Sequence, residues 1–144
     1  MSVEENKTIE RRFMEEVWTK GNLAAVDELV ATNYVDHTPM PDVSPDLQGV
    51  KQFATVVRAA FPDWNPTIED IIAEGDKVVV RFTGRGTHKG EFMGIPPTGK
   101  QLTMMAIAIH RIAGGKIVEN WLQADMLGMM QQLGVVPTPG QGGS

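Results

Sequence analysis

The stretch that decides the fold covers residues 102–125 and reads LTMMAIAIHRIA, then Gly114-Gly115, then KIVENWLQAD. Two long apolar runs around a Gly-Gly pair indicate a β-hairpin, because both central positions of a two-residue turn favour positive φ. If Ala113 and Lys116 close the turn, counting outward places Ile112 opposite Ile117 and His110 opposite Glu119.

Side chains on a strand alternate between the two faces of a sheet, so this register also predicts two faces. One face should carry polar and aromatic side chains with the small Ala106 and Ala108 between them, namely His110, Glu119, Trp121, Gln123 and Asp125, the last of these opposite Met104. The opposite face should be almost entirely apolar, with Met105, Ile107, Ile109, Val118 and Leu122. The pattern predicts a cavity on the first face and a covered surface on the second.

The remainder of the chain reads as helices followed by strands. A capping box at Ser2-x-x-Glu5 begins a helix that ends near Gly21, and Asn22 can cap a shorter second helix. A Pro-rich loop is expected over residues 33–47, and a third helix over 49–61. A second hairpin turns at Gly75-Asp76, with Asp70 opposite Arg81, and the glycines at 84 and 86 predict a bulge or bend. This order predicts an α+β fold with the helices on one face of a curved sheet.

The chain has 144 residues and a net charge of −5, which argues against nucleic-acid and anionic-membrane partners. It contains no cysteine, which excludes thiol chemistry and cysteine-type zinc sites. The histidines and carboxylates show no metal-ligand spacing, so no metal is expected. The first residues lack an apolar signal segment, and a cytoplasmic protein is expected. Residues 1–134 should form a single domain and residues 135–144 a loose tail.

Four stretches of the sequence resemble the SnoaL-like polyketide cyclase family, including its ester cyclase members. They are YVDHTP, FPDW, IIAEGDKVVVRFTGRGTHKGEFMGIPPTGK and HRIAGGKIVENWLQADMLGMMQQLG. The resemblance implies a cone-shaped α+β barrel, in which a strongly curved antiparallel sheet wraps around three N-terminal helices and leaves a deep apolar cavity. It relates the fold to ketosteroid isomerase, limonene epoxide hydrolase and the nuclear-transport-factor superfamily. It also implies a homodimer through the outer sheet face.

For activity, the resemblance implies an intramolecular aldol ring closure that uses neither cofactor nor metal. A carboxylate of the last hairpin acts as the acid/base group in that family. Asp125 is the match on the expected inward face, and Leu122 is the alternative occupant of the position. Aldol chemistry needs a base next to a carbonyl and a donor for the enolate oxygen. Asp125 could instead cap the following helical turn.

His37, in the Pro-rich loop, is the second candidate catalytic residue, because histidine titrates in the useful range. It could equally form a local bond within that loop. His110 with Glu119 is either a base with its orienting carboxylate or a structural cross-strand pair. Arg81 with Asp70 is either a pocket pair or a simple ion pair of the sheet. The side chains expected to bind substrate are Trp121, Gln123, Trp64, Arg81, Met104 and His110.

Three functions remain open from the sequence. The first is a cofactor-independent cyclase or isomerase that acts on an apolar carbonyl compound. The second is a protein that binds a hydrophobic small molecule without turnover. The third is an epoxide hydrolase, which would need an Asp-Arg-Asp arrangement from Asp70, Arg81 and Asp125.

Overall fold

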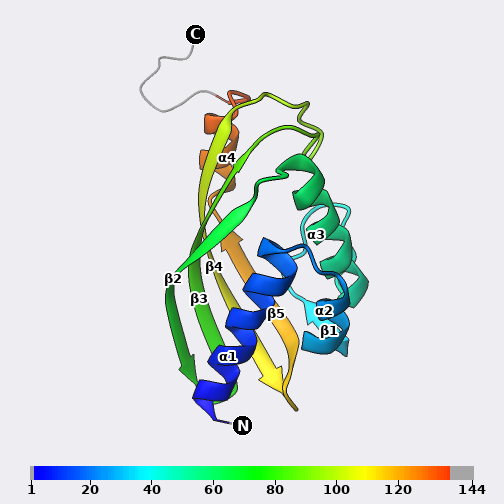
Figure 1. Ribbon diagram of the computed structural model, residues 1–144, viewed down its shortest axis with the longest axis vertical. Coiled ribbons are helices and arrows are strands. Elements are labelled where there is room, and N and C mark those ends of the chain that lie inside the picture. The colour runs from blue at the N-terminus through cyan, green and yellow to red at the C-terminus, as the bar shows by residue number, and fades with distance from the viewer. Residues whose placement is uncertain (1, 137–144) are drawn as a thin grey trace.

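The computed structural model describes residues 2–136, and within them helices and strands form an α+β fold, as predicted (Figure 1). The helices are α1 (Val3–Phe13), the π-helix η1 (Met14–Thr19), α2 (Ala24–Leu29), α3 (Leu47–Ala60) and α4 (Met126–Gln132). The strands are β1 (Val30–Asp36), β2 (Asn65–Glu74), β3 (Lys77–Thr87), β4 (Gln101–Ala113) and β5 (Lys116–Ala124). Most of the tail expected over residues 135–144 lies outside the described residues.

The five strands form one curved sheet in the order β1-β5-β4-β3-β2, with α1 lying across one of its faces (Figure 1). Neighbouring strands are antiparallel except β1, which runs parallel to β5. The prediction that residues 33–36 belong to a loop is therefore wrong. Their backbone pairs with β5, and this parallel pair brings Asp36 opposite Asn120.

The first helix begins with the predicted capping box, in which the Ser2 hydroxyl and the Glu5 side chain each accept from the other's backbone N–H. It continues without a break into η1, whose wider turns leave carbonyl groups at its end without helical partners. The Arg58 guanidinium of α3 donates to the carbonyl oxygens of Trp18 (3.2 Å) and Thr19. This side chain thereby fixes η1 against α3.

The hairpin of β2 and β3 has the predicted register, with Asp70 opposite Arg81 and Glu74 opposite Lys77. The bulge, one of the two alternatives predicted at Gly84 and Gly86, is absent, because the pairing of β3 with β4 runs through both glycines without a shift. A side chain at Gly84 would overlap the Trp64 ring. Glycine is needed there because the indole lies directly on the backbone of β3.

The hairpin of β4 and β5 turns at Gly114 and Gly115, both with positive φ, and pairs Ile112 with Ile117 as predicted. Beyond that pair the predicted register is wrong. The pairing shifts by one residue, so Arg111 lies opposite Glu119 and Val118 has no partner. A bulge of one residue moves every later side chain of the strand to the opposite face.

The shift at Val118 decides which side chains of β5 face the interior. His110 pairs with Asn120 instead of Glu119, and Ala108 pairs with Leu122 instead of Trp121. Asn120 is buried, whereas Gln123 is exposed. The inward face of β5 therefore carries Asn120, Leu122 and Ala124. The predicted register, which had no bulge, placed Leu122 on the outer face and did not place Asn120 or Ala124 in the cavity.

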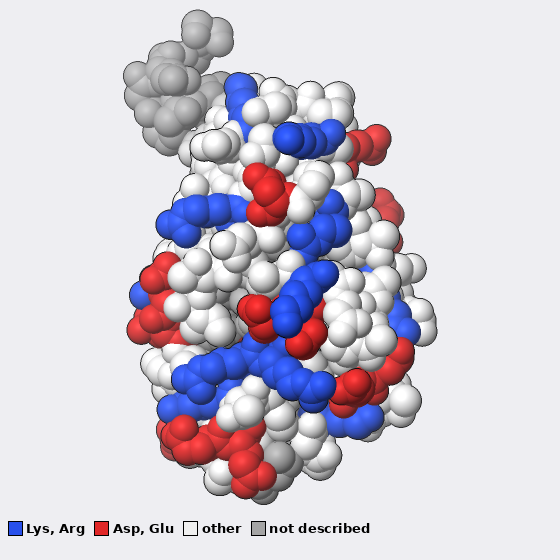
Figure 2. Space-filling model, in the orientation of Figure 1, with Lys and Arg blue, Asp and Glu red and all other residues white. Residues whose placement is uncertain are grey.

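On the face shown in Figure 2, positively and negatively charged side chains are interspersed. None of the helices described in residues 2–136 is long and apolar enough to cross a membrane.

Candidate functional site

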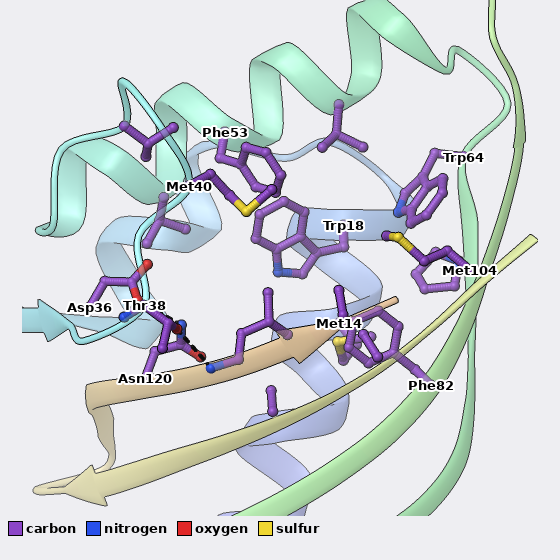
Figure 3. A pocket seen from close by; sticks show the side chains of 18 of the residues that line it. Met14, Trp18, Asp36, Thr38, Met40, Phe53, Trp64, Phe82, Met104 and Asn120 are labelled. Carbon is purple, nitrogen blue, oxygen red and sulfur yellow. Dashed lines mark hydrogen bonds between the residues drawn. The ribbon is translucent and has the colours of Figure 1, made fainter. Parts of the chain in front are cut away.

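A cavity of about 130 Å³ lies between the concave face of the sheet and helices η1 and α3. Its wall is mostly aromatic and methionine side chains, among them Phe13, Met14, Trp18, Met40, Phe53, Phe61, Trp64, Phe82, Phe92, Met104, Met126 and Met129. Figure 3 shows Trp64 and Met104 at one end of this space, and Asp36, Thr38 and Asn120 grouped at the other. An apolar pocket with a few convergent polar groups is the usual form of a small-molecule site.

The polar end is built where β1 runs beside β5. The Asp36 Oδ1 atom accepts hydrogen bonds from the Thr38 backbone N–H (2.9 Å) and the Asn120 Nδ2 atom (3.0 Å). The Thr38 hydroxyl accepts from the backbone N–H of Leu122 at 2.8 Å, which ties the chain after β1 to β5 (Figure 3). All four residues line the cavity. The Asp36 carboxylate is therefore held by neutral groups at the cavity wall.

His110 also lines the cavity, and it is backed by a buried carboxylate from α1. Its Nδ1 atom lies 2.7 and 2.8 Å from the two carboxylate oxygens of Glu10, which is fully buried. Burial opposes the charged form of His110, but attraction to Glu10 and hydrogen bonds with Glu10 and Asn120 outweigh it and raise its pKa. The surroundings of the ring therefore favour the imidazolium form of His110.

Asn120 joins the two titratable side chains of the cavity wall. It lies opposite His110 on the neighbouring strand, helps to raise the pKa of His110, and donates to Asp36. A polar network of Glu10, His110, Asn120 and Asp36 therefore stands at this end of the cavity. The carboxylate of Asp36 and the imidazole of His110 lie at the same end of the cavity. A carboxylate can act as a general base and an imidazolium as a general acid.

Tyr34 lies on β1 two residues before Asp36 and also lines the cavity. Burial raises the pKa of its phenol, and the carboxylates of Asp36 and Glu10 add to the effect. The phenol therefore stays neutral and can donate a hydrogen bond. Within the part of the chain that the structure describes, the cavity wall contains no lysine or arginine.

Asp125 lies at the start of α4 and not in the cavity wall. Its carboxylate accepts from the Gly128 backbone N–H at 2.9 Å, and the residue is exposed. This is the helix-capping alternative. The expectation that Asp125 faces the cavity rested on the unbulged register and is wrong, whereas Leu122 lines the cavity.

His37 lies on the outer side of the sheet, so the expected meeting of His37 with Asp125 in one cavity is also wrong. Its ring stacks on Trp121 with 4.7 Å between centroids, and its Nε2 atom lies 3.2 Å from Glu119. Glu119 also accepts from Arg111. The hydrogen bond from Arg111 is the largest cause of a lowered pKa at Glu119, followed by the bond with His37. Glu119 therefore does not orient His110.

The side chains expected to bind substrate divide into two sets. Trp64, Met104 and His110 line the cavity. Trp121, Gln123 and Arg81 do not line it. Arg81 donates to Asp70 at 2.7 Å across the β2–β3 pair, which is the simple ion pair of the two alternatives.

Three residues of the polar network were missed from the sequence, namely Glu10, Asp36 and Asn120. Glu10 carried a signal, since it falls on the same helical stripe as Phe13 and Val17, where a charged residue is unusual. Asp36 directly precedes His37, the residue that the sequence favoured as a catalytic histidine. Asn120 was displaced to the wrong face by the bulge at Val118.

Among the residues described, no group of three or more histidine or carboxylate side chains is arranged to hold a metal ion. The polar network is instead built from pairs of hydrogen-bonded side chains.

Comparisons with known proteins agree on one family. Residues 8–133 match the SnoaL-like polyketide cyclase family. Over 134 residues the chain is 31% identical to the aklanonic acid methyl ester cyclase DnrD of Streptomyces peucetius, covering 89% of this chain and 91% of DnrD.

Solved structures show the same similarity. TsrD from Streptomyces laurentii aligns with a TM-score of 0.86 and 26% identity, over 94% of this chain and 99% of TsrD. Wild-type IdmH from Streptomyces antibioticus aligns with a TM-score of 0.77 and 35% identity, over 90% of this chain and 99% of IdmH. The resemblance seen in the sequence is confirmed, and the chain belongs to the SnoaL-like polyketide cyclase family.

Proposed function

We propose that this protein is a cytoplasmic, cofactor-independent cyclase that closes a ring in an apolar, polyketide-like carbonyl compound by an aldol reaction. The observation that carries the proposal is the pair of Asp36 and His110 at one end of an otherwise apolar cavity. Family membership and the similarity to DnrD, named as a methyl ester cyclase, support this reaction class.

Asp36 acts as the base. Its carboxylate takes a proton from the carbon beside a carbonyl group, and the electron pair of the broken C–H bond forms an enolate. The neutral phenol of Tyr34 is a suitable donor to the enolate oxygen. The enolate carbon then attacks a second carbonyl carbon of the same substrate, and a C–C bond forms.

His110 acts as the acid that completes ring closure. The electron pair of the attacked C=O bond moves to its oxygen, which receives the proton of the His110 imidazolium. The substrate loses one proton and gains one, so the product is an isomer. Exchange with solvent returns Asp36 to the carboxylate and His110 to its protonated form. General acid–base groups of this kind typically contribute roughly 10²–10⁴-fold in rate.

The charges of the cavity favour an uncharged substrate. Asp36 lines the wall, while the described lining residues include no lysine or arginine that could compensate a second negative charge. Glu10 already balances the charge of the His110 imidazolium, so a free carboxylate on the substrate would be buried beside Asp36 without a cation of its own, which is costly. An ester or ketone avoids that cost, so we expect a methyl ester to react and its free acid to be excluded.

The test compares two aspartates with aklanonic acid methyl ester as substrate. Asp36→Asn keeps the shape but removes the base, so turnover should fall by at least about 100-fold. Asp125→Asn is the matched control, because Asp125 caps α4 outside the cavity, and its turnover should stay within about threefold of the wild-type value. If Asp125→Asn loses turnover and Asp36→Asn retains it, the base is Asp125 and the proposal for Asp36 is wrong.

A non-catalytic binding protein is the second candidate function, and the aromatic and methionine wall of the cavity favours it. It predicts that wild-type protein binds the methyl ester and never cyclises it. The epoxide-hydrolase alternative has less support, because Arg81 pairs with Asp70 and is not among the residues that line the cavity.

We propose that the protein is a homodimer through the outer face of the sheet. Ile72, Met105 and Ile107 are 61%, 48% and 43% exposed on this face, and Trp121 lies beside them. Several exposed apolar side chains on one face of a sheet are typical of an interaction site. Light scattering should report twice the chain mass of 15.8 kDa, and Ile107→Asp should halve it. A wild-type monomer at micromolar concentration would reject this interface.

A further inference from the structure

Glu10 is a buried carboxylate that does not itself reach the cavity. It lies on α1, 100 residues before its partner His110, and none of its surface is exposed. Its two oxygens lie 2.7 and 2.8 Å from the His110 Nδ1 atom. The cavity is lined by His110 and by residues of η1 that follow Glu10 in the chain, but not by Glu10. Its hydrogen-bonded contact with the cavity wall is therefore made through His110.

We propose that Glu10 is the positioning residue for His110: it fixes the proton on Nδ1 and turns Nε2 toward Asn120 and the cavity. This inference rests on the proposed function, in which His110 is the acid. A carboxylate oxygen can only accept, so the imidazole nitrogen that faces Glu10 must carry a proton. The other nitrogen is then the one available to the Asn120 amide and to a substrate.

The geometry favours orientation over stability as the reason for this pair. A charged pair taken out of water contributes little net stability, and well-packed apolar residues of similar volume often serve as well. The ring that Glu10 faces packs against the hydrophobic core, with Phe13 edge-on to His110 at 5.6 Å between centroids. For packing alone, an apolar side chain at position 10 would serve as well as Glu10.

The titratable groups around His110 come from two elements. Glu10 faces it from α1, and Asp36 acts on it from β1. Tyr34, also on β1, is close enough for both carboxylates to affect it. With Glu10 made neutral, Asp36 remains as the charge that favours the imidazolium, and burial opposes it. His110 should then lose its proton at a lower pH, so a smaller fraction of the protein carries the imidazolium that donates in ring closure at neutral pH.

Glu10→Gln is the informative variant, because it keeps the shape and one acceptor oxygen while it removes the charge. Asn6→Ala is the matched control, since Asn6 is the other buried polar residue described on α1 and its amide faces Gly75 at 3.5 Å. Imidazole ¹⁵N spectra recorded between pH 5 and pH 9 report the tautomer and titration of each histidine. The His110 signal is assigned with His110→Gln.

We expect the neutral form of wild-type His110 to carry its proton on Nδ1, and we expect the ring to titrate above its ordinary value. Glu10→Gln should shift that titration to lower pH, and Asn6→Ala should leave it unchanged. With aklanonic acid methyl ester, Glu10→Gln should lower kcat by about 10-fold or more and change KM much less. Its rate should also decline at a lower pH than the wild-type rate.

Two results would overturn the inference. The first is an unchanged titration of His110 in Glu10→Gln. The second is a wild-type spectrum in which neutral His110 carries its proton on Nε2 alone. The second result needs only wild-type protein, so it contradicts the inference even if Glu10→Gln does not fold. Failure of the proposed function looks different. Wild-type protein would then show the expected His110 spectrum and no turnover.

Discussion

Asp36 and Asn120 are 84 residues apart in sequence, and their side chains are joined by a hydrogen bond of 3.0 Å at the end of the cavity. Two backbone features place them there. The parallel pair of β1 and β5 sets them side by side, and the bulge at Val118 turns Asn120 inward. The polar end of the site therefore depends on the register of β5 as much as on the residues themselves.

Loss of the Asn120 side chain should separate Asp36 from the pair of His110 and Glu10. Asn120→Ala removes the donor to Asp36 and the partner of His110, so kcat should fall by about 10-fold while the protein still folds. Steady-state kinetics with aklanonic acid methyl ester measures this effect. Gln123→Ala on the exposed face of the same strand is the control. An equal loss in both variants would mean that β5 itself, and not the network, is disturbed.

Tryptophan fluorescence should report binding through Trp18 and Trp64, which line the cavity, and not through Trp121. We expect Trp121→Phe to retain the quenching caused by an apolar aromatic ligand. Trp64→Phe should lose a large part of it. The reverse pattern would show that ligands bind on the outer face beside His37.

The buried pair of Glu10 and His110 should make stability depend on pH. A histidine whose folded-state pKa is raised contributes stability that is fully present below its unfolded value of about 6.5 and is lost as pH rises through the folded value. The free energy of unfolding of wild type minus that of Glu10→Gln should therefore be largest near pH 6 and shrink at higher pH. Urea unfolding at several pH values measures it. A difference that grows with pH would contradict the raised pKa.

Arg58 should matter for stability because it satisfies the carbonyls at the end of η1. Arg58→Ala should lower the free energy of unfolding by about 2–3 kcal/mol, since hydrogen bonds to a charged group are lost. Arg85→Ala, at an exposed position of β3, should change it by less than about 0.5 kcal/mol. Urea titrations of both variants provide the comparison. An effect below about 1 kcal/mol for Arg58→Ala would mean that water replaces the guanidinium.

Local patterns were enough to predict the fold class. The capping box at Ser2, the Gly-Gly turn at Gly114 and the pairing of Asp70 with Arg81 are each decided by a few neighbouring residues, and the structure confirms them. The family resemblance then supplied the arrangement of the elements, which local patterns alone cannot give.

The site was harder to predict because it depends on contacts between distant segments. No local pattern marks Val118 as the bulged residue, and without that bulge Trp121 is assigned to the cavity in place of Asn120. Strand β1 was missed because its pairing with β5 is parallel and joins segments far apart in the chain. Glu10 was the one network residue with a signal of its own, a carboxylate in an apolar helical stripe.

Proton exchange at the substrate carbon is the most direct test of Asp36 as the base. Aklanonic acid methyl ester is incubated in D₂O with wild type, Asp36→Asn and Asp125→Asn, and deuterium beside the reacting carbonyl is followed by mass spectrometry. We predict enzyme-dependent exchange with wild type and Asp125→Asn, and none above the enzyme-free rate with Asp36→Asn, although that variant still binds the ester. Exchange at the wild-type rate in Asp36→Asn would contradict the account.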